Sequence, residues 1–118
     1  MPKALPLLDV TSPVACSPIA AGAMDEHAAL EVALRLKALA DPARLRLLSL
    51  ILAAPTGEAC NCDLAPAVGL SDATVSHHLK ALREAGLIVG DKRGTWIYYS
   101  PVRPALGALC KIIDPDCC

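Results

Sequence analysis

The chain has 118 residues, a length that suits one compact domain better than two. Lys and Arg together number 11 and Asp and Glu number 12, so the net charge of −1 excludes a strongly cationic wrapping protein and an acidic disordered chain. The hydrophobic fraction of 54% does not indicate a membrane protein, because no stretch approaches the roughly 20 uninterrupted apolar residues that a spanning helix needs. The unusual feature is six cysteines, which a small helical domain does not need for packing.

Residues 1–24 contain four prolines and show no helical periodicity, so we expect a flexible N-terminal arm there. Polar residues and prolines interrupt its apolar stretch, which therefore lacks the continuous hydrophobic segment of a secretory signal. This predicts a cytoplasmic protein that has no contact with a membrane. In that compartment, clustered cysteines are usually reduced thiols that bind metal or take part in redox chemistry, and less often form disulfides.

Two helices are predicted first along the chain. Apolar residues at helical spacing predict a helix over residues 25–39, with Asp25 suited to its first turn. Asp41 followed by Pro42 is an N-cap with proline at the first helical position, which starts a second helix. This second helix ends at the turn that contains Gly57. Because it is apolar nearly all round, we expect it to lie at the centre of the fold.

The next two helices are separated by a short turn. A helix over residues 60–68 is ended by Gly69, and Ser71 caps a fourth helix that spans residues 71–85. The turn between them, Val68-Gly69-Leu70-Ser71, has four residues and contains glycine, as a helix-turn-helix requires.

The hydrophobic period then changes from helical to extended. Leu87–Gly90 and Thr95–Ser100 are rich in β-branched and aromatic residues and are joined by a polar segment, which predicts a β-hairpin. A fifth helix is expected over residues 101–113, followed by a tail at 114–118. The sequence thus predicts a mainly α winged helix-turn-helix of five helices plus a wing, in one domain over residues 25–113.

The fourth helix has the features of a DNA recognition helix. A rotation of about 100° per residue places Val75, Leu79 and Leu82 on the inward face, and small polar and basic side chains on the opposite one. A merely solvated face is the alternative. Residues 73–103 hold five basic and two acidic side chains, however, a local charge of +3 that favours DNA. We predict that double-stranded DNA contacts Ser71, Thr74, Ser76, His77, Lys80, Arg83, Lys92 and Arg93.

Two histidines on this helix need separate treatment. His77 and His78 are adjacent, so their side chains point about 100° apart and do not easily share one ligand site. We expect a structural role or a DNA contact for both, in preference to metal binding.

The cysteines at the start of the third helix suggest a site for a soft ion. Cys60 lies outside the helix, which allows its sulfur and that of Cys62 to turn toward one ion, and a helix N-terminus stabilises a thiolate. Three sulfurs suit pyramidal As(III) or Sb(III), and four suit tetrahedral cadmium or zinc. Cys16 on the arm is a candidate third ligand. The alternative for Cys60 and Cys62 is a pair of small buried hydrophobes. A second cluster is conceivable at Cys110, Cys117 and Cys118.

Two segments resemble a known family. Residues 36–48, LKALADPARLRLL, and residues 71–88, SDATVSHHLKALREAGLI, are similar to the signature and recognition-helix motifs of the ArsR/SmtB family of metal-responsive repressors. The resemblance extends over about residues 30–100 and includes the wing around Arg93. It implies a homodimer held by the first and last helices and bound to an inverted-repeat operator. It also implies that an inducer lowers the affinity for DNA and releases transcription.

The same resemblance bears on the cysteines. The segment from Glu58 to Asp63 is similar to the metal-binding box of arsenic, antimony, cadmium and lead sensors in that family. In some members an N-terminal cysteine of the other protomer completes the site, which fits Cys16, and in others C-terminal thiols sense the ion. The family's zinc site uses Asp and His on the last helix. Residues 101–113 contain neither, which disfavours a zinc sensor of that type.

These observations predict a repressor of a metalloid-resistance operon that leaves its operator when As(III) or Sb(III) binds Cys16, Cys60 and Cys62. One N-terminal cysteine, where cadmium-type sensors tend to use two, favours a site with three sulfurs. The alternatives are a cadmium- or lead-responsive repressor, a thiol-redox-sensing repressor and a plain DNA-binding module with incidental thiols. No nucleophile and base are paired in the sequence, so neither an enzyme nor an organic cofactor is expected.

Overall fold

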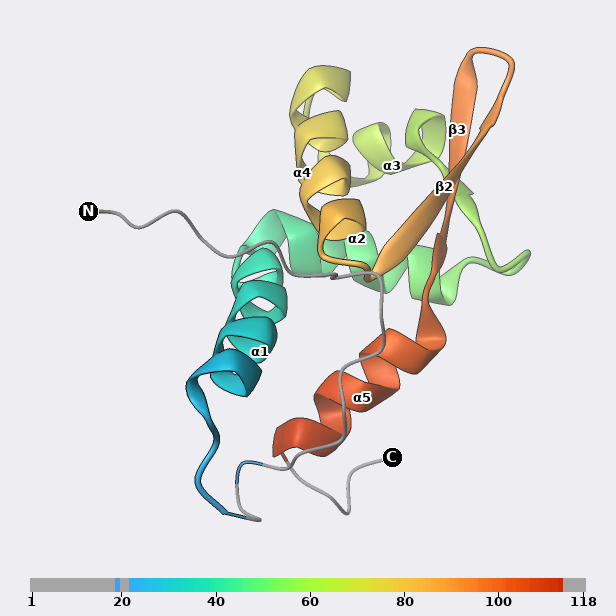
Figure 1. The fold of residues 1–118 in the computed structure, drawn as a ribbon. Coiled ribbons are helices and arrows are strands. Elements are labelled where there is room, and N and C mark those ends of the chain that lie inside the picture. The colour runs from blue at the N-terminus through green and yellow to red at the C-terminus, as the bar shows by residue number, and fades with distance from the viewer. Residues whose placement is uncertain (1–18, 20–21, 114–118) are drawn as a thin grey trace.

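The computed structural model describes residue 19 and residues 22–113, which form five helices and three strands (Figure 1). Most of the predicted arm and the whole predicted tail therefore lie outside the described residues. The prediction of a mainly α fold with a hairpin is confirmed. In chain order the elements are α1 (Glu26–Leu39), α2 (Pro42–Ala53), β1 (Ala59–Cys60), α3 (Asn61–Val68), α4 (Asp72–Glu84), β2 (Ile88–Arg93), β3 (Trp96–Pro101) and α5 (Arg103–Ile113).

Local signals set the ends of the helices, as the sequence predicts. Asp25, Asp41 and Ser71 are the N-caps of α1, α2 and α4, and each accepts a backbone N–H of the first turn through its side-chain oxygen. Gly69 ends α3 in the left-handed region, at φ 70°, which a residue with a Cβ rarely adopts. These caps hold the turn between α3 and α4 short, so that the two helices pack against each other.

The cap at Asp41 predicts a dependence of stability on pH. The N–H groups of Arg44 and Ala43 donate to its carboxylate and lower the pKa of Asp41 below the ordinary value of 3.8. A lowered pKa stabilises the fold above the ordinary value, and this stabilisation is lost as the pH falls through the lowered one. In Asp41→Asn, which keeps a capping oxygen but does not titrate, the melting temperature should depend less on pH between 7 and 3. If the melting temperatures of the two chains fell equally as the pH is lowered, this account would be contradicted.

The sheet differs from the predicted hairpin in three ways. β2 and β3 pair as far as Arg93 with Trp96, so the turn is only Gly94-Thr95 and Lys92 lies in a strand. β3 continues through Pro101, which shortens the predicted fifth helix. A third strand, β1, pairs with β3 and gives the order β1-β3-β2. β1 was missed because two residues are too few to show a hydrophobic period.

The core is aliphatic and lies between the helices and one face of the sheet. The inward face predicted for α4 is confirmed, since Val75, Leu79 and Leu82 are at most 1% exposed. The predicted central place of α2 is confirmed, since this helix packs against α1, α3, α4 and β3, although Leu45 and Leu52 are 51% and 36% exposed. None of the helices in the described part combines the length and apolar character needed to cross a bilayer.

The elements divide the molecule into two ends. The start of α4, the helix α3 and the tip of the hairpin lie together at the top of Figure 1, and α1 and α5 extend toward the opposite end. This arrangement leaves the outer side of α4 and the β2–β3 hairpin, which is the wing, accessible at the same end.

Candidate DNA interface and thiol site

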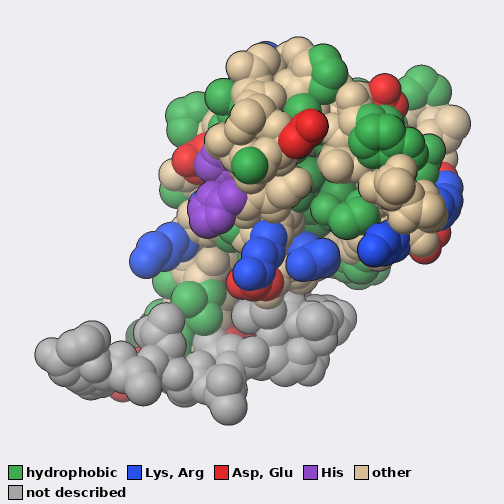
Figure 2. Space-filling view, turned by 90° about the horizontal axis from the view of Figure 1, so that it is seen from above, with side chains coloured by type: hydrophobic (Ala, Val, Ile, Leu, Met, Phe, Trp, Pro, Cys, Tyr) green, Lys and Arg blue, Asp and Glu red, His purple; other side chains and the backbone are tan. Residues whose placement is uncertain are grey.

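The outer face of α4 is polar and accessible. All six DNA-contact candidates on and before this helix are exposed; they are Ser71, Thr74, Ser76, His77, Lys80 and Arg83. The Ser71 hydroxyl donates to the Thr74 hydroxyl at 2.9 Å, which orders the first turn. Lys80 contacts Glu84 at 3.8 Å across two exposed side chains, an ion pair weak enough to be exchanged for a phosphate. Figure 2 looks onto this end of the molecule and shows Lys, Arg and His side chains gathered along one edge.

The two adjacent histidines have different surroundings. His77 is exposed, whereas His78 is half-buried and accepts a hydrogen bond at Nδ1 from Nε of Arg44, at 3.1 Å. Arg44 belongs to α2, so this bond ties α4 to the core helix behind it. The structure thus gives His78 a structural contact and leaves His77 on the face that the sequence assigns to DNA.

The two basic residues of the wing, Lys92 and Arg93, have different surroundings. Lys92 and Arg93 are both exposed, but the guanidinium of Arg93 lies between two carboxylates. Its Nε donates to Asp91 at 2.9 Å, and its two terminal nitrogens contact the carboxylate of Glu58 at 3.0 and 2.9 Å. The hydrogen bonds that its guanidinium donates to Glu58, the larger influence, and to Asp91 raise the pKa of Arg93. The charge count over residues 73–103 missed Glu58, which reduces the basic excess on this surface.

One position in the wing, Gly90, has little room for a side chain. A Cβ at Gly90 would lie 3.1 Å from Cγ2 of Ile97 and 3.2 Å from Cε1 of Tyr99, whose ring covers this part of β2. We therefore expect Gly90→Ala to lower the free energy of unfolding by about 1–3 kcal/mol, because the two side chains must shift. Urea denaturation measures the change, and an unaltered midpoint would show that the ring moves freely.

Cys60 and Cys62 lie at the junction of β1 and α3. Cys60 is the N-cap of α3, is 1% exposed, and accepts the N–H of Cys62 at its sulfur, at 3.0 Å. The Cα atoms are 5.1 Å apart and the two sulfurs form a disulfide. The structure thus brings both sulfurs together at a helix N-terminus, in the oxidised form where the sequence favours reduced thiols. The burial of Cys60 also fits the alternative that it is a small core residue, whereas Cys62 is half-buried.

The other cysteines are not assembled with this pair in the described part of the chain. Cys16, Cys117 and Cys118 lie outside the described residues. The structure therefore does not test the prediction that Cys16 is the third ligand. Cys110 lies on α5, is half-buried and takes part in a disulfide. Among residues 19 and 22–113, no three His, Cys, Asp or Glu side chains are grouped as a metal site would require.

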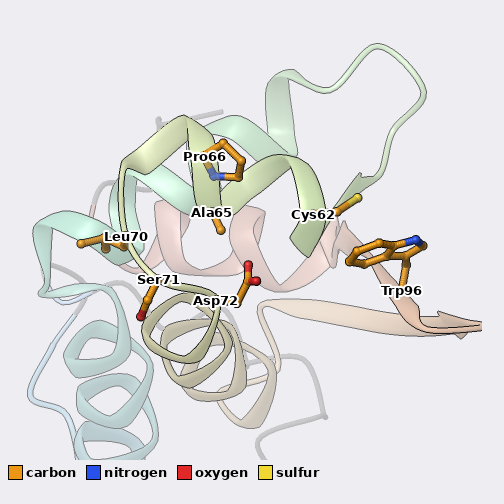
Figure 3. A pocket seen from close by; sticks show the side chains of 7 residues that line it. All are labelled: Cys62, Ala65, Pro66, Leu70, Ser71, Asp72 and Trp96. Atoms are coloured by element: carbon orange, nitrogen blue, oxygen red, sulfur yellow. The ribbon is translucent and has the colours of Figure 1, made fainter.

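A hollow of about 380 Å³ opens beside Cys62. Figure 3 shows Cys62 and Trp96 at one end of this hollow, with Asp72 from the start of α4 on its wall. Trp96 is 47% exposed and is the chain's one tryptophan. Cys62, the wing and the start of α4 therefore meet around one hollow. Sequence reasoning missed the contribution of Trp96, because 34 residues separate it from Cys62.

Fold and surface together define a winged helix-turn-helix protein with an exposed polar recognition helix. The chain belongs to the ArsR family of bacterial regulatory proteins, whose model matches residues 41–89. The arsenical resistance operon repressor of Escherichia coli is 45% identical over 80 residues, which cover 66% of this chain. The match spans 65% of that relative, slightly less than two thirds of its length.

Solved structures agree with this assignment. The chain is similar to a homodimeric winged helix-turn-helix DNA-binding domain from Mycobacterium bovis, with a TM-score of 0.59 and 35% identity over 74% of this chain and 82% of that one. It is also similar to the AntR antimony-specific transcriptional repressor, with a TM-score of 0.64 and 34% identity over 75% and 78% of the two chains. The predicted family is confirmed. These relatives are named as regulators of transcription and not as enzymes, which agrees with the prediction that this chain is not an enzyme.

Proposed function

We propose that this chain is a homodimeric transcriptional repressor of a metalloid-resistance operon, released from its operator when As(III) or Sb(III) binds cysteine thiolates. The observation that carries the proposal is the position of Cys60 and Cys62. Their sulfurs lie together at the start of α3, and α3 packs directly on α4. The relatives support the ligand class, since one is named an arsenical resistance operon repressor and another an antimony-specific repressor.

The DNA-binding half of the proposal uses the exposed face of α4. The first turns of this helix enter the major groove, where hydroxyls and helix N–H groups contact phosphates and longer side chains such as Lys80 reach base edges. Lys92 and Arg93 of the wing contact the adjacent backbone. A twofold dimer presents two such helices to an inverted repeat, and it acts in the cytoplasm, where its DNA is.

The sensing half of the proposal uses three thiolates. Cys60 and Cys62, in reduced form, supply two sulfurs, and Cys16 supplies the third from the arm, which gives the pyramidal set that As(III) or Sb(III) prefers. A fourth sulfur from Cys110, Cys117 or Cys118 would produce the tetrahedral set of a cadmium- or lead-responsive repressor. Binding releases DNA only if the ligated form favours a dimer whose recognition helices no longer match successive major grooves.

The test uses the reduced full chain and a fluorescent duplex that it selects from a random-sequence pool. Arsenite should lower the anisotropy of the complex, and it should change the fluorescence of Trp96 even without DNA, because the indole lies beside Cys62. X-ray absorption should find three sulfurs around arsenic. Four sulfurs around cadmium, with release by cadmium alone, would transfer the function to the cadmium- or lead-responsive alternative. If none of these ions releases the duplex, the proposal is refuted.

A redox-sensing repressor is the second candidate, and the Cys60–Cys62 disulfide favours it. In this function two thiols and one hydrogen peroxide molecule yield one disulfide and two water molecules, with the sulfurs oxidised and the peroxide reduced. Release of the duplex by peroxide without metal, reversed by dithiothreitol, would establish this candidate. A complex that is insensitive to peroxide would exclude it.

A further inference from the structure

Glu58 connects the wing to the segment that carries Cys60 and Cys62, called the thiol segment below. It precedes Cys60 by two residues, and its carboxylate engages both terminal nitrogens of Arg93, at 3.0 and 2.9 Å. Asp91 occupies Nε of the same guanidinium, whose face lies 4.6 Å above the ring centre of Tyr98. All three nitrogens of the Arg93 guanidinium therefore contact a carboxylate, and one face of the group lies against Tyr98.

This arrangement works against DNA binding by the wing. One guanidinium between two carboxylates has a net charge of −1, which repels the phosphate backbone. Arg93 reaches a phosphate only after it gives up Glu58, because the paired nitrogens are those that a phosphate would engage. The side chains are 50% and 28% exposed, so water screens the ion pair and the exchange is feasible.

The segment around Glu58 also contacts the wing through its backbone. Ala59 and Cys60 pair with Tyr99 and Tyr98 of β3, so the residue that follows Glu58 is already part of the sheet. Next to them, the side-chain oxygen of Asn61 accepts the N–H of Ile97 at 3.3 Å. A ligand that fixes Cys60 and Cys62 would therefore also fix the place of Glu58 relative to Arg93.

We propose that Glu58 is a positioning residue that competes with DNA for Arg93 and couples the thiol site to the wing. With free thiols, Arg93 exchanges Glu58 for an operator phosphate. Ligation of Cys60 and Cys62 holds the segment against β3, keeps Arg93 on Glu58 and lowers the affinity for DNA. This inference rests on the function proposed above, and it requires that the ligated state favours the ion pair more than the free state does.

The test compares Glu58→Gln with Asp91→Asn, since each removes one carboxylate from Arg93 and keeps its shape. Both variants should bind the selected duplex several-fold more tightly than the wild type. For Glu58→Gln, the plot of log affinity against log salt concentration should steepen by up to about 0.9, because Arg93 then reaches its phosphate without first breaking an ion pair. Arsenite should then release Glu58→Gln less than the wild type. It should release Asp91→Asn fully, because Asp91 bonds Arg93 from within the same hairpin and the Glu58–Arg93 ion pair is kept in that variant.

Further measurements separate the possible failures. Melting curves and the Trp96 response to arsenite show whether Glu58→Gln keeps its fold and its thiol site. Should that variant not fold, Arg93→Gln tests the same route, since it too should show reduced release by arsenite. A wild-type chain that neither binds the duplex nor responds to arsenite refutes the proposed function. A wild-type chain that does both, beside a Glu58→Gln variant with unchanged or weaker binding and normal release, overturns the role of Glu58 alone.

Discussion

Replacement of Cys60 and Cys62 by serine should leave operator binding intact and abolish its release by arsenite. A serine hydroxyl is a poor ligand for a soft ion, so the double variant loses two of the three proposed donors. The fold should survive, because serine is a preferred N-cap and can accept the N–H of residue 62 as the sulfur of Cys60 does. Where arsenite lowers the affinity of the wild-type chain by about 5- to 150-fold, the usual range for coupled sites, the variant should show no change.

Anisotropy of the labelled duplex measures this effect, and Trp96 fluorescence reports on binding separately. Cys110→Ser is the matched control, since it removes one thiol from α5 and should keep the response to arsenite if three sulfurs suffice. In the redox-sensing alternative the double variant should also be insensitive to peroxide, because the Cys60–Cys62 disulfide cannot form. Normal release of the double variant by arsenite would place the sensing thiols elsewhere in the chain.

The elements that the sequence predicts well are those with local causes. Asp41 caps α2 through N–H groups two and three residues away, and Gly69 ends α3 through its own backbone conformation. The inward face of α4 follows from the helical period, which repeats within the helix. Such features need only neighbouring residues, so a single sequence contains all the information that they require.

The features that escaped prediction join residues far apart in the chain. The bonds from Arg44 to His78, from Arg93 to Glu58 and from Ile97 to Asn61 span 34 to 36 residues. β1 exists only because β3 lies beside it. The motif of the thiol pair could be read from its spacing, but its closeness to Trp96 and its attachment to the wing depend on how α3 packs under the hairpin. No periodic or capping signal reports such packing.

Leu79→Ala should destabilise the chain more than any other single replacement considered above. Leu79 is completely buried on the inner face of α4, where Val75 and Leu82 flank it. Loss of its side chain leaves a cavity and costs about 2–5 kcal/mol of unfolding free energy. In a domain of this size each kcal/mol corresponds to about 4–8 °C, so the melting temperature should fall by at least about 8 °C.

The matched control is Leu70→Ala, in the turn before α4. Leu70 is 38% exposed, so its truncation removes the same atoms without opening a closed cavity, and the melting temperature should change far less. Both variants must be melted at one protein concentration, because dissociation of a dimer makes the midpoint depend on it. Below its lowered midpoint, Leu79→Ala should still bind the selected duplex, since Leu79 faces away from the exposed side of α4. Equal losses of stability in the two variants would mean that the core does not form around α4 as described.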